Sequence, residues 1–247
     1  MTDKLIYKFE KCGHTDCAPC NLVDYESREI DYVCDYLDRV VEGGMLNGAF
    51  IDVGAHAGLW SLQMSEWYRN RYNVVPSILA LEPDDLNFIA LKKNAEQADT
   101  GIHPLKAAAW NKDIKLFFSK NSIPARHRVF EIGVSGRTAL RVQGVSLDGM
   151  AKTKKGRQVD AIKIDVEGAE LNVLNGAREI LNANKQLLIV VEYSIDNFTA
   201  YGCHPKQVTA FMESHGFLPA REEDVQVTNQ INLGELKRVI FVKGDII

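Results

Sequence analysis

The clearest chemical signature in this sequence is a glycine loop, Phe50-Ile-Asp-Val-Gly-Ala-His-Ala-Gly58. A short apolar run leads into Asp52, and the pattern predicts a strand, a tight turn and a helix that begins at Leu59. In a dinucleotide-binding fingerprint the middle glycine lets the backbone approach a pyrophosphate. His56 occupies that position here, and its side chain would obstruct a pyrophosphate. The loop therefore favours an adenosine ligand that has no pyrophosphate.

S-adenosylmethionine (SAM) is a ligand of this kind, and a second carboxylate lies where its ribose would need one. Residues 77–81 read as a buried strand that ends in Glu82-Pro83. Glu82 follows Asp52 by about 30 residues, the length of one βαβ unit, and a carboxylate at this place holds ribose hydroxyls. Asp52 suits the ammonium group of SAM. The predicted cofactor residues are Asp52, Gly54, Ala55, His56, Gly58, Glu82, Pro83, Ala108 and Asp165.

Small residues follow the third predicted strand, 102–106. Ala107, Ala108 and Ala109 come where an adenine ring would lie, and their size leaves room for the ring. Close packing of small residues beneath a loop explains them equally well, so both interpretations stay open.

Two further carboxylates follow later strands of the predicted sheet. Asp165 ends the fourth strand, and the apolar run 186–191 delivers Glu192 to the same edge. A carboxylate beside a methyl donor could take the proton of a hydroxyl acceptor, and His127 is a third candidate base. Asp165 could instead orient the cofactor or the loop around Gly168. A divalent metal between Asp165 and Glu192 is a further alternative, because paired carboxylates bind magnesium.

Residues 114–145 have a looser pattern than the strands around them. Alternation around 139–145 predicts a hairpin inserted between the third and fourth core strands. An insertion at the carboxyl end of a parallel sheet commonly shapes a substrate pocket. Its arginines could meet an anionic or sugar-like acceptor, although charges of this kind more often face solvent.

A cysteine-rich loop near the start gathers four potential metal ligands, Cys12, His14, Cys17 and Cys20. Zinc sites usually draw two ligand pairs from separate places, so four ligands within one short loop would be cramped. The chain has five cysteines, an odd number, which argues against a disulfide framework. A loop of free thiols is the simpler interpretation, and a zinc site is the alternative.

The composition is that of an ordinary globular protein and restricts the partners. The net charge of −4 over 247 residues gives no general attraction to nucleic acid or to anionic membranes. No apolar run has the length of a signal-peptide core or a membrane span. We therefore expect a cytoplasmic protein with a small-molecule partner, and a homodimer is compatible with the sequence.

The order of the predicted elements indicates an α/β fold. Residues 1–46 form an N-terminal extension with the cysteine-rich loop and a helix over 24–41, and residues 47–247 form one domain with the insertion at 114–145. Strands that alternate with helices predict a mostly parallel sheet covered on both faces. Residues 217–219 and 239–242 predict a final antiparallel pair.

Four stretches together resemble the FkbM family of SAM-dependent methyltransferases. They are Phe50–Gly58, Leu81-Glu-Pro83, Val145-Ser-Leu-Asp148 and Ile162-Lys-Ile-Asp-Val-Glu-Gly-Ala-Glu170, the last being the most specific, and the match covers roughly 48–220. The resemblance implies a Rossmann-like class I methyltransferase with a seven-stranded sheet whose last strand is antiparallel. It also implies O-methylation of a hydroxyl on a sugar, a natural product or another small molecule. His56 replaces the usual asparagine of the loop, and the start up to Cys20 has no counterpart.

Two other function classes compete with this interpretation. An NAD-type oxidoreductase would share the first βαβ unit, but His56 and the lack of a later dehydrogenase signature count against it. A catalytically inactive methyltransferase fold could serve only for binding. Retention of Asp52, Glu82 and Asp165 together argues against that alternative, because an inactive site need not keep all three.

Overall fold

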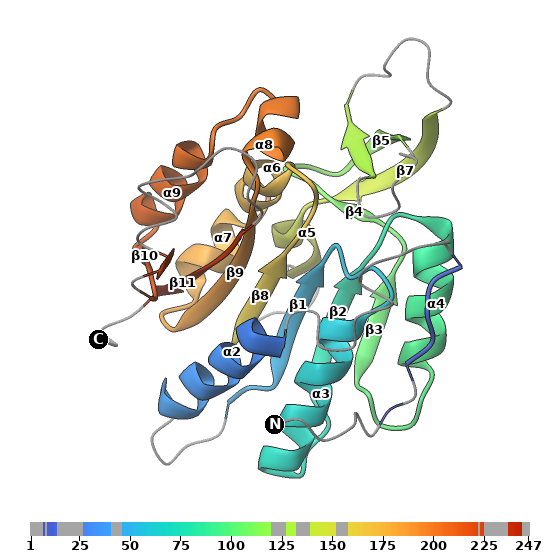
Figure 1. Cartoon of the computed structure of the whole chain (residues 1–247), viewed down its shortest axis with the longest axis vertical. Coiled ribbons are helices and arrows are strands. Elements are labelled where there is room, and N and C mark those ends of the chain that lie inside the picture. Colours follow the sequence, from blue (N-terminus) through green and yellow to red (C-terminus); the bar gives the residue numbers. More distant parts are fainter. Residues whose placement is uncertain are drawn as a thin grey trace.

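The computed structural model describes residues 7, 9–13, 27–40, 46–119, 127–131, 139–151, 158–221, 223–224 and 237–243 (Figure 1). The helices are α2 (Ser27–Val40), α3 (Leu59–Tyr72), α4 (Asp85–Ala95), α5 (Leu147–Ala151), α6 (Glu170–Asn175), α7 (Arg178–Ala183), α8 (Ile195–Ala200) and α9 (Pro205–Ser214). The strands are β1 (Ala49–Val53), β2 (Ser77–Leu81), β3 (Ile102–Leu105), β4 (Ala108–Ala109), β5 (Ile114–Ser119), β6 (Arg128–Phe130), β7 (Ala139–Val145), β8 (Ala161–Ile164), β9 (Leu187–Tyr193), β10 (Phe217–Pro219) and β11 (Lys237–Lys243).

A seven-stranded sheet forms the centre of the molecule, in the order β10-β11-β9-β8-β1-β2-β3. Strands β3, β2, β1, β8 and β9 are parallel to one another, whereas β11 runs antiparallel to both β9 and β10. The predicted fold class is therefore confirmed, including the antiparallel last strand. In this arrangement the carboxyl ends of β1, β2, β8 and β9 meet at one edge of the sheet.

Alternating side chains of the strands pack into two separate cores. Phe50 and Ile78 belong to a cluster with residues of α2, α3 and α4, whereas Ile51 and Leu81 belong to one with residues of α6, α7 and α9. This period-two alternation gives the sheet a helical layer on each face. No helix among the described residues is long and apolar enough to span a membrane.

A second, four-stranded sheet in the order β4-β7-β5-β6 occupies the region of the predicted insertion. Strand β5 is antiparallel to β6 and β7, while the short β4 pairs with β7 in parallel. In Figure 1 this sheet projects beyond the ends of the central strands. Residues of β6 therefore reach the same edge of the central sheet as the loops that follow β1, β2 and β8.

One predicted helix is divided in the structure. A single apolar face through Leu174, Ala177 and Leu181 predicts a continuous helix, but α6 ends at Asn175 and α7 begins at Arg178. Gly176 lies so close to the backbone oxygen of Trp110 that a side chain there would overlap it. This close approach to another segment interrupts the helix. Pro205, a residue type favoured in the first turn of a helix, and Gly216, a residue type favoured at a helix end, predict a helix between them, and α9 confirms it with Pro205 in its first turn.

Candidate active site

A cavity of about 300 Å³ lies at the carboxyl edge of the central sheet. Its walls come from the loops after β1, β2, β3, β8 and β9 and from the second sheet. The predicted residues that line it are Gly54, Ala55, His56, Glu82, Pro83, Ala108, His127, Asp165 and Glu192. The structure therefore brings most of the predicted site residues into one cavity.

The glycine loop has the tight turn that its sequence predicts. Gly54 has a φ of 75°, and a Cβ there would overlap the backbone oxygen of Asp165. Only glycine tolerates this combination of a left-handed backbone and a close approach. His56 also has a left-handed backbone, with a φ of 54°, a conformation in which asparagine and histidine are enriched among non-glycine residues. Histidine can thus occupy the place of asparagine without changing the turn.

Glu82 is buried and joins the two halves of the βαβ unit. Its Oε2 accepts a hydrogen bond of 2.8 Å from the backbone N–H of His56, and Oε1 accepts one of 2.8 Å from that of Asp84. Burial raises the pKa of Glu82 to about 7, although these hydrogen bonds oppose the shift. A carboxylate offers about four lone-pair sites, so Glu82 retains acceptor capacity for hydroxyls in the cavity.

Asp52 is not among the residues that line the cavity, which differs from the expectation that it meets the cofactor. It is fully buried, and its Oδ2 accepts a 2.7 Å hydrogen bond from the hydroxyl of Ser61. Its Oδ1 is 3.5 Å from the Nζ of Lys163. The carboxylate is thus engaged by protein groups and offers no surface to a ligand. Gly58, also predicted to bind the cofactor, is likewise absent from the wall.

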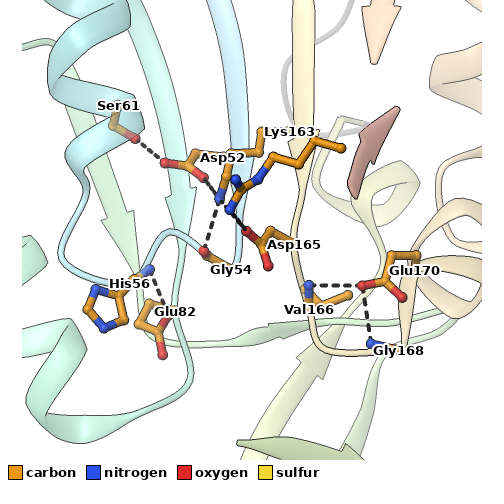
Figure 2. Close-up of polar contacts among 11 residues, drawn as sticks. Asp52, Gly54, His56, Ser61, Glu82, Lys163, Asp165, Val166, Gly168 and Glu170 are labelled. Atoms are coloured by element: carbon orange, nitrogen blue, oxygen red, sulfur yellow. Dashed lines mark hydrogen bonds and ion pairs between the residues drawn. The ribbon is translucent and has the colours of Figure 1, made fainter. Parts of the chain in front are cut away.

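Lys163 connects Asp52 to Asp165 across the site, as Figure 2 shows. Its Nζ is 3.6 Å from the Oδ2 of Asp165 and donates a 3.4 Å hydrogen bond to the backbone oxygen of Gly54. Arg238 of β11 adds a 3.2 Å ion pair to the same Oδ2. Burial raises the pKa of Asp165, but the charges of Lys163 and Arg238 outweigh it and hold that pKa below its usual value. Asp165 is therefore ionised and makes a weak base.

Three glutamates near Asp165 have pKa values that are raised, whereas the pKa of Asp165 is lowered. Burial, with repulsion from Asp165, raises the pKa of Glu167 to about 8, and burial raises that of Glu170 to about 7. The pKa of Glu192 lies well above its usual value for the same two reasons. Glu170 accepts hydrogen bonds from the backbone N–H groups of Val166 and Gly168, so it supports the loop without lining the cavity.

Three carboxylates could hold the predicted divalent metal, but two cationic side chains already contact one of them. Carboxylate oxygens of Asp165, Glu167 and Glu192 lie within 4.8 Å of one another. Lys163 and Arg238 already pair with Asp165, and a divalent ion would need all three residues as ionised ligands, so it would have to displace both side chains from Asp165. We therefore assign no metal ligands here.

The second sheet contributes the outer wall of the cavity. His127 lies 3.8 Å from the Oδ2 of Asp84 and packs edge-on against Phe118. Arg128 donates a 3.0 Å hydrogen bond to the Oδ1 of Asn197, whose Nδ2 donates one of 2.7 Å to Glu167. A chain of contacts thus links the second sheet to the acidic loop.

Of the predicted zinc ligands, Cys12 alone lies within the described residues. It is buried against Ala57 and Ala90 beside the glycine loop. The predictions for His14, Cys17 and Cys20 fall outside the described residues. Phe9, in the same N-terminal segment as Cys12, lines the cavity.

Sequence reasoning did not single out Lys163, Arg238, Glu167 or Asn197 as site residues. A lysine within the apolar strand β8 was a detectable signal, because a buried lysine requires a charged partner. Arg238 and Asn197 are separated from Asp165 in the sequence, and only the sheet order brings them near. The position of Glu167 shortly before a helix is explained equally well by a favourable interaction of its carboxylate with the helix dipole.

Comparisons with known proteins agree with this architecture. A family model described as the Methyltransferase FkbM domain matches residues 52–219, more than half of the chain. AglP, a hexuronic acid methyltransferase of Haloferax volcanii, is 23% identical over 186 residues, covering 74% of this chain and 67% of that protein.

Two solved structures are similar to this chain. A methyltransferase FkbM from Methylobacillus flagellatus aligns with a TM-score of 0.48 and 13% identity, covering 78% of this chain. This chain spans 43% of that protein's length. A candidate rRNA methylase from Clostridium thermocellum aligns with a TM-score of 0.50 and 10% identity, covering 89% of this chain and 95% of that one, which supports the fold alone. The match over residues 52–219 shows that the chain belongs to the FkbM family of SAM-dependent methyltransferases.

Proposed function

We propose that this protein transfers a methyl group from SAM to a hydroxyl of a small, sugar-like acceptor. The observation that carries the proposal is the single cavity that joins Glu82 and the glycine loop to the polar cluster around Asp165. One end of that cavity suits an adenosine, and the other suits a reacting hydroxyl.

The residues present fit SAM as the cofactor. Gly54 and Ala55 of the loop line the cavity, and Ala107, Ala108 and Ala109 line it as small residues would for an adenine. Glu82 would accept hydrogen bonds from the ribose hydroxyls. Because its pKa is raised, such hydrogen bonds would change its ionisation near neutral pH. A pyrophosphate would have to pass the side chain of His56, which disfavours the alternative of an NAD cofactor.

Bound SAM supplies an activated methyl group, so the protein's own task is to position the acceptor and manage its proton. Asp165 is held rigidly by Lys163 and Arg238 and is suited to positioning. Glu192 lines the cavity beside it and has a raised pKa, so it can hold or donate a proton. Polar groups that sugar hydroxyls could meet, Ser194, Asp196 and Asn197, line the same end.

The choice of a sugar-like acceptor rests on the relative AglP, which is a hexuronic acid methyltransferase, and on the polar wall of the cavity. Arg128 lines that wall and could meet a carboxylate of such an acceptor. The net charge of −4 gives no general attraction to nucleic acid, which favours a small-molecule acceptor.

Ligand binding tests the cofactor assignment. We expect SAM and S-adenosylhomocysteine (SAH) to bind in isothermal titration calorimetry and NAD not to bind. Hydrogen bonds to a charged acceptor contribute about 1.5 to 3 kcal/mol, so Glu82→Ala should weaken SAH binding roughly ten- to a hundredfold. The control is Glu96→Gln, which changes an exposed carboxylate at the C-terminal cap of α4. NAD binding, or an unchanged SAH affinity in folded Glu82→Ala protein, would contradict the assignment.

A further inference from the structure

Three carboxylates crowd the reacting end of the cavity. Oxygens of Asp165, Glu167 and Glu192 lie within 4.8 Å of one another, and all three residues line the cavity. Carboxylates this close cannot all be ionised without a compensating charge. Lys163 and Arg238 compensate the negative charge of Asp165. Glu167 and Glu192 therefore hold protons near neutral pH, consistent with their raised pKa values.

The backbone holds Glu167 in this crowded position. Glu167 has a left-handed φ of 58°, and Gly168 follows with a φ of 108°, so close to the backbone oxygen of Asn197 that a side chain would overlap it. The Nδ2 of Asn197 then donates a 2.7 Å hydrogen bond to the Oε2 of Glu167. Strained conformations of non-glycine residues occur preferentially at functional sites. The loop is thus built to present this carboxyl group to the cavity.

Glu192 supplies an independent sign that a ligand is missing from the cluster. Its side chain is 3% exposed, and its Oε2 has no hydrogen-bond partner among the described residues. The charged groups that face it are Asp165, Glu167, Glu170 and Arg238. Those that face Glu167 are Asp165, Glu170 and Arg128. Glu167 and Glu192 are therefore neutral in the free protein, and one of them can lose its proton only when a further positive charge comes near.

We propose that the carboxylate cluster of Asp165, Glu167 and Glu192 holds the positive charge of SAM, and that the cluster gives up one proton when it does so. Glu167 is then left as the ionised base that accepts the proton of the acceptor. The inference rests on the proposed function, because it concerns the same cofactor. SAH lacks the sulfonium charge, so the cluster should keep its proton when the protein binds SAH.

The proposed step balances in atoms and charge. The acceptor oxygen forms a bond to the methyl carbon while the bond from that carbon to sulfur breaks, and its electron pair stays on the sulfur of SAH. The hydroxyl proton moves to Glu167, which becomes neutral as the sulfonium charge disappears. The cluster therefore ends the reaction in the protonation state that it has in the SAH complex.

This coupling predicts a pH dependence that separates SAM from SAH. The pKa of Glu167 is about 8 in the free protein, and a nearby cation would lower it. The ratio of SAM affinity to SAH affinity should therefore rise with pH below about 8, by at most about tenfold per pH unit for one released proton. Ionisation of Glu82, whose pKa is about 7, adds the same pH dependence to both ligands and cancels in this ratio.

Calorimetry in buffers of different ionisation enthalpy counts the protons released on binding. At pH 7, in phosphate and in imidazole buffers, we expect SAM to release close to one proton per protein more than SAH does, because the proton released from Glu82 at the ribose is common to both ligands. Glu167→Gln and Glu192→Gln should each reduce the release and the preference for SAM over SAH. Glu96→Gln should behave as the wild type because its carboxylate is exposed at the C-terminal cap of α4, outside the cavity.

The outcomes distinguish the two proposals. Failure of both SAM and SAH to bind would overturn the proposed function, and this inference with it. Binding of both ligands with equal proton counts and equal pH dependence would overturn this inference alone. This comparison uses the wild-type protein and requires no variant. Tight Mg²⁺ binding to the free protein that is lost in Glu192→Gln would also contradict it, because the cluster would then be a metal site.

Discussion

Lys163 and Arg238 divide the acidic groups of the site into two kinds. Asp165, paired with both cations, stays ionised, whereas Glu167 and Glu170 have pKa values raised to about 8 and about 7. Neighbouring carboxyl groups with separated pKa values commonly divide their roles, with one fixing charge and the other moving protons. The same separation has a consequence for stability.

We expect the free protein to become less stable as the pH rises from about 5 to about 8.5. The pKa values of Glu82, Glu167 and Glu170 are higher in the folded protein than the ordinary 4.5, so the folded state binds more protons within this window. Their stabilising contribution is complete below the ordinary pKa and is lost as the pH passes the folded values. The pKa of Asp165 is shifted in the opposite direction, so its contribution to the free energy of unfolding changes only at acidic pH.

Urea unfolding at pH 5.5, 7 and 8.5 measures this trend. The free energy of unfolding should fall with pH by on the order of 1.4 kcal/mol per pH unit for each group that changes state. A constant or rising stability between pH 5.5 and 8.5 would show that these glutamates are not protonated in the folded protein.

Site residues at strand ends could be predicted because parallel topology fixes where such residues go. Glu82, Asp165 and Glu192 each follow an apolar run, and all three line the cavity. Asp52 also follows a recognisable run, but its burial depends on Lys163 and Ser61, whose orientation no local pattern reveals.

Among the elements, the attachment of β6 to Tyr201, the C-cap residue of α8, controls the outer wall of the cavity. The hydroxyl of Tyr201 donates a 2.9 Å hydrogen bond to the backbone oxygen of Val129 and accepts one of 3.1 Å from its N–H. Its ring stacks on Phe130 with centroids 5.4 Å apart. One side chain therefore fixes the strand that carries Arg128.

Tyr201→Phe should keep the stacking but leave two backbone groups of β6 without their partner. Unsatisfied buried groups cost about 1 to 3 kcal/mol, so we expect a loss of unfolding free energy of that order. Hydrogen–deuterium exchange should increase at residues 127–131 and stay unchanged in the glycine loop. The control is Tyr32→Phe, which removes one hydrogen bond of 3.3 Å to Ala220 in another part of the molecule. Unchanged exchange in β6 would mean that Tyr201 does not hold the strand.

The elements themselves were largely predictable, with physical exceptions. Strong start and stop residues such as Pro205 and Gly216 marked α9, and fully apolar residues marked β9. The break between α6 and α7 was not predictable, because its cause is the backbone of Trp110, which is distant in sequence from Gly176. The pairing of the second sheet likewise depends on contacts between separated segments.

At the scale of the whole molecule, one edge of the central sheet collects nearly all of the proposed chemistry. Loops after β1, β2, β8 and β9 meet there, the second sheet covers them, and Phe9 of the N-terminal segment completes the wall. The segment is attached through Asn94, whose side chain donates to the backbone oxygens of Glu10 and Ala57. Residues from before the matched family region thus contribute to the cavity.

A crystal structure of the protein with SAH tests the central claim most directly. We predict the ribose hydroxyls on Glu82, the adenine beside Ala107, Ala108 and Ala109, and the sulfur facing Asp165 and Glu167. SAH bound outside this cavity, or bound within it with the ribose away from Glu82, would contradict the account.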